Sequence, residues 1–380
     1  MRDLFLALLS MFCVGCSSGQ PARIDASVFD RTDLIYGSEL GSWPMNDDRY
    51  DGYPILDHPD VVQRAGITVV KWAVWNVFDD MEPPPGQTAP PMTRAQFDAV
   101  VDGIRDRFGA LPMIKLQPSE SDPPGLFCPD RWGEDRLADF NRRIVAEAGP
   151  RVQLYELTNE MELDCGFGGD AGVRLARHWI AQAPMLKKHA RSLGFEIYLG
   201  GPGIQKIDGT MRAPGTRTAV DFLRTVHDAY EDPSSPVYHD PDVVPSFFSF
   251  HGYADDCVDA ETNGPNTTEL DCVRYYGLYV DQVRAAIDRV WGPQLGPRIK
   301  IAQTEWNFGQ EKSYDRSPAA VWDARAPAFY RAMLAMFRQH GVWMANQFAI
   351  GSDDGPMDMI GVDGDTRPTY DAFAAERRTR

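Results

Sequence analysis

Strand-like and helix-like segments alternate along this chain, and the alternation limits its fold more than any other feature. Eight short runs rich in apolar and β-branched residues are typical of strands: residues 34–38, 67–77, 111–116, 152–157, 196–199, 247–250, 299–302 and 342–350. Apolar residues recur with a helical rhythm in the intervening stretches: residues 61–65, 95–108, 135–148, 172–193, 220–230, 276–290 and 327–340, with a closing helix from residue 368. Eight such units over about 345 residues predict a single (β/α)8 TIM barrel with long βα loops.

A doubly wound α/β sheet is the alternative architecture. Such a sheet would be expected to carry a glycine-rich phosphate loop after its first strand. The glycine-rich run at residues 200–203 lacks that spacing and comes too late in the chain. Two helix boundaries have clear signals, since Thr93 can cap the helix that follows it and Gly66 marks the end of another.

The N-terminal residues resemble a targeting segment rather than part of the fold. The apolar run at residues 4–12 is too short to anchor the chain across a bilayer, and it ends in Cys13–Cys16, which resembles a bacterial lipobox. The resemblance implies a lipid on Cys16, and Ser17 resembles a signal for sorting to the outer membrane. We therefore expect an exported, membrane-anchored protein at the outer membrane or periplasmic face, with an ordinary cleaved signal peptide as the alternative. The expected segments are a signal peptide (1–15), a tether (16–30) and the barrel (31–380).

Export would place the remaining cysteines in an oxidising compartment. Four cysteines follow Cys16, and we expect the disulfides Cys128–Cys165 and Cys257–Cys272. The first would tie together two loops that follow neighbouring strands. A zinc site is the alternative, but no pair among these four cysteines has the close spacing of a structural zinc site.

Charge argues against a nucleic-acid partner. The net charge is −17, and lysine and arginine form no long cluster on which a phosphate backbone would dock. No sequence signal points to a cofactor or a bound metal, and the sequence leaves the oligomeric state open.

Two glutamates stand where strand-like runs end. Glu160 follows the fourth run and Glu305 follows the seventh, so both are expected at the mouth of the barrel, facing one another across it. Two facing carboxylates are the minimum equipment for glycosidic bond cleavage, in which one protonates the leaving oxygen and the other attacks the anomeric carbon or activates a water.

The motifs around these glutamates resemble those of clan A glycoside hydrolases, closest to family 39, the group of β-xylosidases and α-L-iduronidases. The similar segments are residues 155–163, 249–253, 304–307 and 367–373. Thr158 and Met161 depart from the tryptophan and proline that usually flank the Asn-Glu pair. Lys71–Ala73 replaces the family's Arg-Phe-His, and we expect no accessory β domain of the kind that often follows the barrel in that family. These departures spare the catalytic pair but leave the substrate open.

The resemblance implies a retaining mechanism, with Glu160 as general acid/base and Glu305 as nucleophile. Asn159 would bond the sugar 2-hydroxyl, and His251 or Tyr253 would hold Glu305 ionised. Trp306 is expected to be either a sugar platform or barrel-rim packing. The candidate substrate contacts are Asn159, His251, Tyr253, Trp306, Lys71, Gln117, Glu39 and Gln347. Glu156 is expected to be structural and bonded to Lys71 or Lys115, because a charge inside a strand is expensive unless paired.

Two other functions compete with a glycosidase acting on an oligo- or polysaccharide. One is a non-catalytic carbohydrate-binding surface lipoprotein on a barrel scaffold, although a binder has no need of both glutamates. The other is a metal-dependent barrel hydrolase, which would want a His-x-His near the first strand or a Lys/His/Asp ligand set, and neither is apparent.

Overall fold

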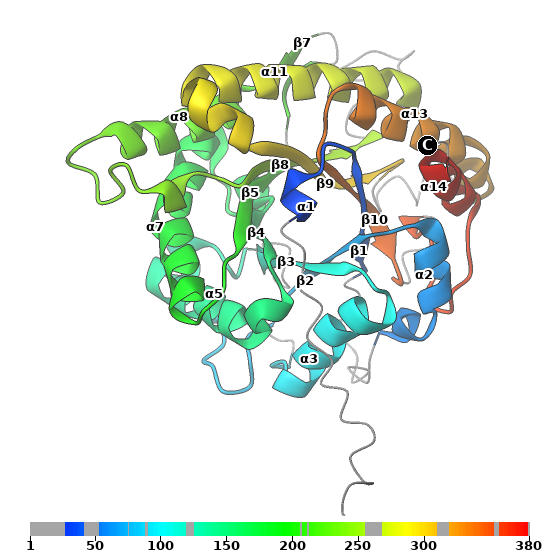
Figure 1. The fold of residues 1–380 in the computed structure, drawn as a ribbon, viewed down its shortest axis with the longest axis horizontal. Coiled ribbons are helices and arrows are strands. Elements are labelled where there is room, and N and C mark those ends of the chain that lie inside the picture. Colours follow the sequence, from blue (N-terminus) through cyan, green and yellow to red (C-terminus); the bar gives the residue numbers. More distant parts are fainter. Residues whose placement is uncertain are drawn as a thin grey trace, which may run out of the picture. The chain divides into compact units, whose positions relative to one another are not determined.

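In the part of the chain that the structure describes, eight parallel strands close into a barrel surrounded by helices (Figure 1). The strands are β1 (Ile35–Leu40), β2 (Val69–Ala73), β3 (Leu111–Pro118), β4 (Leu154–Asn159), β5 (Tyr198–Ile204), β8 (Phe247–Tyr253), β9 (Lys300–Asn307) and β10 (Met344–Ile350). Each strand pairs with the next of this series, and β10 pairs with β1 to close the ring. The predicted (β/α)8 fold is confirmed.

The structure is a computed structural model, and it describes residues 27–41, 53–74, 76–87, 90–118, 125–205, 207–210, 213–254, 268–309, 319–352 and 357–378. Each barrel strand is followed by one main helix. These helices are α2 (Pro59–Ala65), α3 (Arg94–Asp102), α5 (Glu134–Ala148), α7 (Ala171–Ser192), α8 (Arg217–Glu231), α11 (Glu269–Leu295), α13 (Ala319–Gln339) and α14 (Pro368–Arg378). Residues Arg31–Arg380 form one unit, to which the short helix α1 (Ser27–Asp30) does not belong.

Both helix-boundary signals in the sequence act as expected. The Thr93 hydroxyl accepts a hydrogen bond from the backbone of Gln96, whose side chain bonds back to the Thr93 backbone, which completes a capping box at the start of α3. Gly66 ends α2 in the left-handed conformation (φ 77°), where a side chain would be strained.

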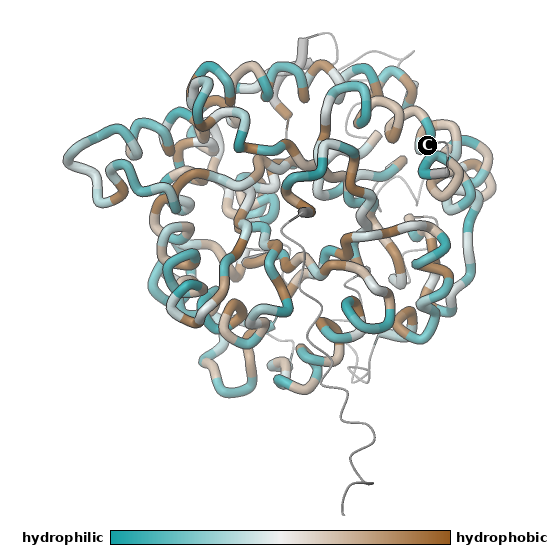
Figure 2. Tube along the Cα trace, viewed as in Figure 1, coloured by the Kyte–Doolittle hydropathy of each residue, from teal (hydrophilic) through white to brown (hydrophobic). Residues whose placement is uncertain are grey.

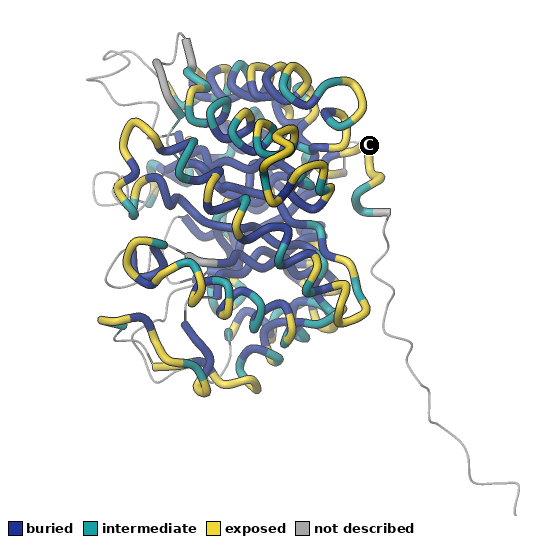
Figure 3. Tube along the Cα trace, turned by 90° about the vertical axis from the view of Figure 1, so that its left-hand side faces the viewer, coloured by how far each residue is buried: buried dark blue, intermediate teal, exposed yellow. Residues whose placement is uncertain are grey.

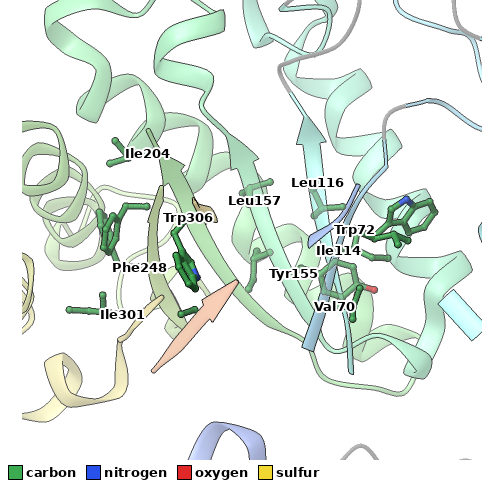
Figure 4. Close-up of a cluster of buried hydrophobic side chains, with 14 of the residues drawn as sticks. Val70, Trp72, Ile114, Leu116, Tyr155, Leu157, Ile204, Phe248, Ile301 and Trp306 are labelled. Carbon is green, nitrogen blue, oxygen red and sulfur yellow. The ribbon is translucent and has the colours of Figure 1, made fainter. Parts of the chain in front are cut away.

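Side chains alternate between two environments along each barrel strand. Apolar residues face the surrounding helices and form the main core, as Val70 and Trp72 on β2 and Tyr155 and Leu157 on β4 do (Figure 4). The barrel strands are mostly buried, whereas the outer surfaces of the helices are exposed and hydrophilic (Figures 2 and 3). The residues between the apolar positions point into the lumen of the barrel.

Several elements differ from their predicted bounds, and two of the differences involve glycine or proline. The glycine-rich run at residues 200–203, expected at the end of the fifth strand, lies inside β5. Glycine is needed there because a side chain at Gly200 or Gly201 would collide with neighbours such as the Phe247 ring. The helix expected to start at Pro327 begins eight residues earlier in α13, which accommodates that proline within it. A short hairpin, β6 (Asp208–Thr210) with β7 (Ala213–Gly215), was not predicted.

None of the helices in the described ranges is long and apolar enough to cross a membrane.

Candidate active site

An unusual backbone turn presents Glu160 at the end of β4. Thr158 and Glu160 both have positive φ values, 74° and 47°, which non-glycine residues adopt only when their surroundings hold them. The Thr158 hydroxyl donates to the carbonyl of Pro202 (2.7 Å), and the Glu160 amide donates to the carbonyl of Gly203 (3.0 Å). A Cβ at position 203 would lie 3.0 Å from the Thr158 carbonyl oxygen, so glycine lets β5 approach and support this turn.

His251 on β8 joins the two predicted catalytic glutamates. Its Nδ1 atom lies 2.5 Å from Glu160 Oε1 and 3.3 Å from Glu305 Oε2. One oxygen from each carboxylate and one His251 nitrogen all lie within 4.8 Å of one another. The structure therefore brings the side chains at the ends of β4, β8 and β9 into one cluster, as their positions in the sequence predicted.

Both carboxylate oxygens of Glu305 are bonded by neighbouring side chains. Tyr253 donates its hydroxyl to Oε2 (2.8 Å), while the ammonium groups of Lys71 and Lys115 lie 2.7 and 3.0 Å from Oε1. All of these groups are nearly or fully buried. A carboxylate that accepts three charged or polar donors away from water is fixed in orientation and favoured in its ionised form.

Two further carboxylates complete the polar lumen beneath Glu305. Glu39 on β1 pairs through Oε2 with Lys71 (2.8 Å) and through Oε1 with Lys115 (3.0 Å). Glu156 on β4 accepts from the Thr304 hydroxyl (2.6 Å) and lies 3.4 Å from Lys71. The predicted pairing of Glu156 with Lys71 is thus observed.

The lumen gives these groups unequal proton affinities. Burial alone would raise the pKa of the Glu305 carboxyl, but His251, Lys115 and Lys71 outweigh burial and hold that pKa well below its usual range. Burial lowers the pKa of His251 to about 4, so its imidazole is neutral near pH 7. At that pH it is therefore the two lysines that hold down the pKa of Glu305. Burial, followed by the Glu305 charge, raises the pKa of Glu39 to about 8. The charges of Glu305, Glu39 and Glu156 outweigh burial and raise the pKa of Lys71.

Glu160, His251 and Glu305 have the side-chain types and proximity of a metal-binding set. Two ammonium groups already contact Glu305 Oε1, however, and their positive charges oppose a cation at this place. The donor set therefore fits a metal poorly and suits a pair of carboxylates that act on protons and carbon.

Several residues predicted to contact substrate lie elsewhere. Trp306 is fully buried outside the lumen, where its ring packs against Tyr330, Phe337 and Phe373, so it is core packing rather than a sugar platform (Figure 4). Gln347 is also buried, and its side chain bonds Ser38, Tyr330 and the Met357 carbonyl.

Lys71 and Glu39, predicted to contact substrate, lie near Glu305 but not at the surface of the site. Both side chains are fully buried beneath Glu305, so they contact the nucleophile candidate and its lysine partners instead of the space above. Asn159 is buried next to Glu160. The side chain of Gln117 lies outside the described residues, and its role stays a prediction.

Two residues of the site were not predicted there. Lys115 was expected only as a partner of Glu156, yet it contacts Glu305 and Glu39. Phe348 at the end of β10 is partly exposed and its ring lies 6.4 Å from that of Tyr253, which places an aromatic surface beside the nucleophile candidate. An aromatic residue at a strand end was the available signal for Phe348.

The segment after Glu160 is tied to its neighbour by a disulfide. Cys128 and Cys165 are bonded, as predicted, and join the loop after β3 to the end of α6 (Met161–Asp164). The other predicted pair involves Cys257, which lies outside the described residues, as do Cys13–Cys16.

No protein-family model and no curated protein matches this sequence. Several solved structures are similar to it in fold. A glucosidase from Croceicoccus marinus is 16% identical, with 92% of this chain and 68% of that chain covered and a TM-score of 0.57. A monomeric beta-xylosidase from Caulobacter crescentus is 15% identical, with 90% and 68% covered and a TM-score of 0.56.

A broad-specificity endoglucanase of the GH5-4 group from Clostridium cellulovorans is 11% identical, with 92% of this chain and 95% of that chain covered and a TM-score of 0.59. Other matches include structures described as family 39 glycoside hydrolases. At these identities the likeness establishes a shared barrel fold. The expected resemblance to clan A barrels, family 39 among them, is confirmed at the level of the fold.

Proposed function

We propose that this protein is a retaining glycoside hydrolase in which Glu305 is the nucleophile and Glu160 the general acid/base. One observation carries the proposal: two buried glutamates from β4 and β9 meet in different surroundings, Glu305 held by two lysines and a tyrosine and Glu160 hydrogen-bonded to His251. Glycosidases use two carboxyls in different environments, one kept ionised and the other able to hold a proton. The solved structures that share the fold and are described as glucosidase, xylosidase and endoglucanase support the same class.

The proposed reaction has two steps. Glu160 gives its proton to the leaving oxygen while a Glu305 oxygen bonds to the anomeric carbon, and the bond between that carbon and the leaving oxygen breaks. Glu160, now ionised, then takes a proton from a water molecule that attacks the same carbon and restores Glu305. His251 holds Glu160 in place, and Tyr253 keeps the Glu305 carboxylate oriented.

The closest approach of the two carboxylates agrees with retention. Retaining enzymes hold their carboxyl groups about 5–5.5 Å apart, whereas inverting enzymes leave about 6.5–9.5 Å for a water. One oxygen of Glu160 and one of Glu305 lie within 4.8 Å of each other. The retaining mechanism is proposed on the resemblance to clan A glycoside hydrolases, which this short approach supports.

The geometry disfavours a mere sugar-binding role. Burying a cluster of charges beneath a binding site is costly, and a binder gains nothing from holding one carboxylate ionised with two ammonium groups. A binder would need open polar and aromatic groups instead. The substrate class we propose is an O-glycoside of an oligo- or polysaccharide.

The test uses the protein from Ser17 onward beside its Glu305→Gln and Glu160→Gln variants. Each is incubated with aryl β-xylosides, β-glucosides, β-galactosides, α-arabinofuranosides and iduronides, and the first-formed product anomer is followed by NMR. We expect turnover with retained configuration that is lost in Glu305→Gln, kept in a Glu196→Gln control on an exposed loop, and unaffected by a chelator. Inverted product, or activity that the chelator abolishes, would overturn the mechanism.

We further propose that Cys16 carries a lipid that anchors the enzyme to a membrane. The support is the lipobox-like ending of the apolar run at residues 4–12. Full-length protein expressed with a radiolabelled fatty acid should be labelled, and its Cys16→Ser variant should not be. An unlabelled protein released by the cells would favour a simple cleaved signal peptide.

A further inference from the structure

The lumen beneath the nucleophile holds more acid than base. Three carboxylates, Glu39, Glu156 and Glu305, surround the two ammonium groups of Lys71 and Lys115. All five side chains are at most 2% exposed. A net charge in such a place is costly, so the five groups are most stable when one carboxyl carries a proton.

Glu39 is the carboxyl best placed to carry it. Glu156 has a hydroxyl donor from Thr304 as well as Lys71, and Glu305 has Tyr253 as well as both lysines. Glu39 has the two lysines alone among the contacts described for its side chain, and it shares both of them with Glu305. The raised pKa of Glu39, which burial and the Glu305 charge produce, agrees with this choice.

The geometry of Glu39 nevertheless also suits its ionised form. Its two oxygens lie 2.8 and 3.0 Å from different ammonium groups, as ion-pair contacts without hydrogen-bond geometry. The attraction of both ammonium groups favours the ionised form of Glu39 when the competing charge on Glu305 disappears.

We propose that Glu39 is a positioning residue that holds a proton while Glu305 is ionised and releases it when Glu305 becomes an ester. The inference rests on the proposed function, because only covalent catalysis removes the Glu305 charge. Lys71 and Lys115 then face two negative charges in both states: Glu305 and Glu156 in the resting enzyme, Glu39 and Glu156 in the intermediate. The lumen stays neutral through the cycle.

The proton count closes over one turnover. In the first step the Glu160 proton leaves with the departing alcohol, the Glu305 charge is consumed in the new carbon–oxygen bond, and Glu39 releases its proton to solvent. In the second step water supplies its oxygen to the sugar and a proton to Glu160. Glu305 regains its charge, and Glu39 takes a proton back from solvent.

The charged and titratable groups around Glu39 come from each neighbouring strand that carries one. They are Lys71 on β2, Lys115 on β3, Glu156 on β4, Tyr253 on β8 and Glu305 on β9. Tyr253 stays protonated, because burial followed by the Glu305 charge raises its pKa well above its usual range. Glu305 is therefore the group whose charge changes during the proposed reaction and acts on Glu39.

The test needs no substrate. In protein labelled with 13C at the glutamate carboxyls, the Glu39 signal is identified by its loss in Glu39→Gln, or in Glu39→Asp if the amide variant does not fold. Glu305→Gln replaces the charge with a neutral group of the same shape, as the ester would. We expect Glu39 to titrate near pH 8 in the parent protein, and its midpoint to fall by about one unit or more in Glu305→Gln.

Glu196→Gln, an exposed change on the loop between α7 and β5, should leave the Glu39 midpoint where it is. A Glu39 signal that titrates below about pH 6 like an ordinary carboxyl, or one that Glu305→Gln does not move, would overturn the proposal. Because the titration requires no turnover, its result is independent of the activity test. An inactive protein with the expected shift refutes the glycosidase, and an active one without the shift refutes the role of Glu39.

Discussion

His251 Nδ1 lies 2.5 Å from Glu160 Oε1, a short hydrogen bond between a buried imidazole and the proposed acid/base. The contact crosses from the sixth barrel strand, β8, to the end of β4. Burial lowers the pKa of this histidine to about 4, so the imidazole is neutral when Glu160 must hold its proton. A neutral partner positions the acid without pulling the proton from it by charge.

His251 should therefore shape the pH dependence of stability. Its pKa is about 4 in the native protein, whereas an unperturbed histidine has a pKa of about 6.5, so the unfolded chain binds more protons between those pH values. The free energy of unfolding should fall as the pH drops from about 6.5 to about 4, with this histidine contributing at most about 1.4 kcal/mol per pH unit. The free energy of unfolding, measured in urea at several pH values in that range, should depend less steeply on pH in His251→Asn than in the parent protein. The same pH dependence in both proteins would refute the neutral imidazole.

Removing a lysine beneath the nucleophile should shift the acidic side of the pH profile of kcat/KM to higher pH. Lys115→Met takes one positive charge from Glu305 Oε1, 3.0 Å away, so the pKa of Glu305 rises. The acidic limb of kcat/KM should shift upward by about 1–3 pH units, and the broken buried pair should cost about 3–5 kcal/mol of stability. Lys188→Met, which removes an exposed lysine on α7, is the matched control. An unmoved limb in a folded Lys115→Met protein would contradict this account.

Much of this site follows from the position of residues in a barrel. Glu160, His251 and Glu305 end strands that the sequence marks by their apolar runs, and in a barrel the carboxyl ends of all strands share one mouth. Trp306 shows the limit: it directly follows Glu305, yet strand alternation turns it to the opposite side, against α13 and α14. Because odd and even positions of a strand face opposite sides, closeness to Glu305 in the sequence does not bring Trp306 to the site.

The lysine cluster shows a second limit. Lys71, Lys115 and Glu156 each stand between apolar residues, a pattern that identifies them as lumen-facing. Which lysine meets which glutamate depends on register and side-chain reach, since Glu39 lies beside Lys71 and Lys115 beside Glu156 in the strand pairing. The contacts of both lysines with Glu305 span several strands and are visible only in three dimensions.

Substitutions of the two aromatic residues near Glu305, Trp306 and Phe348, should have different effects on stability and KM. Trp306→Leu should lower stability by several kcal/mol, about 3–5 for loss of a buried aromatic side chain, with a small change in KM. Phe348→Leu should raise KM with a smaller loss of stability, because its ring is partly exposed beside Tyr253. Thermal unfolding and steady-state kinetics on both variants check this, and the opposite pattern would return Trp306 to the sugar site.

The disulfide after the acid/base should matter for stability. Cys128 and Cys165 are 37 residues apart, so losing their bond should cost about 4 kcal/mol by the chain-entropy argument. The double serine variant should unfold at lower urea concentration than the parent protein. Unfolding at the same concentration would mean that the bond does not hold these loops in solution.

The central claim is that Glu305 attacks the sugar, and the most direct measurement identifies the residue that becomes bonded to it. The protein is incubated with activated 2-deoxy-2-fluoro glycosides of the sugar it turns over, then digested and mapped by mass spectrometry. The account predicts one sugar per chain, on the peptide that contains Glu305, and none in Glu305→Gln. A sugar on Glu160 or Glu39, or an enzyme that turns over its substrate with inversion and is never labelled, would contradict it.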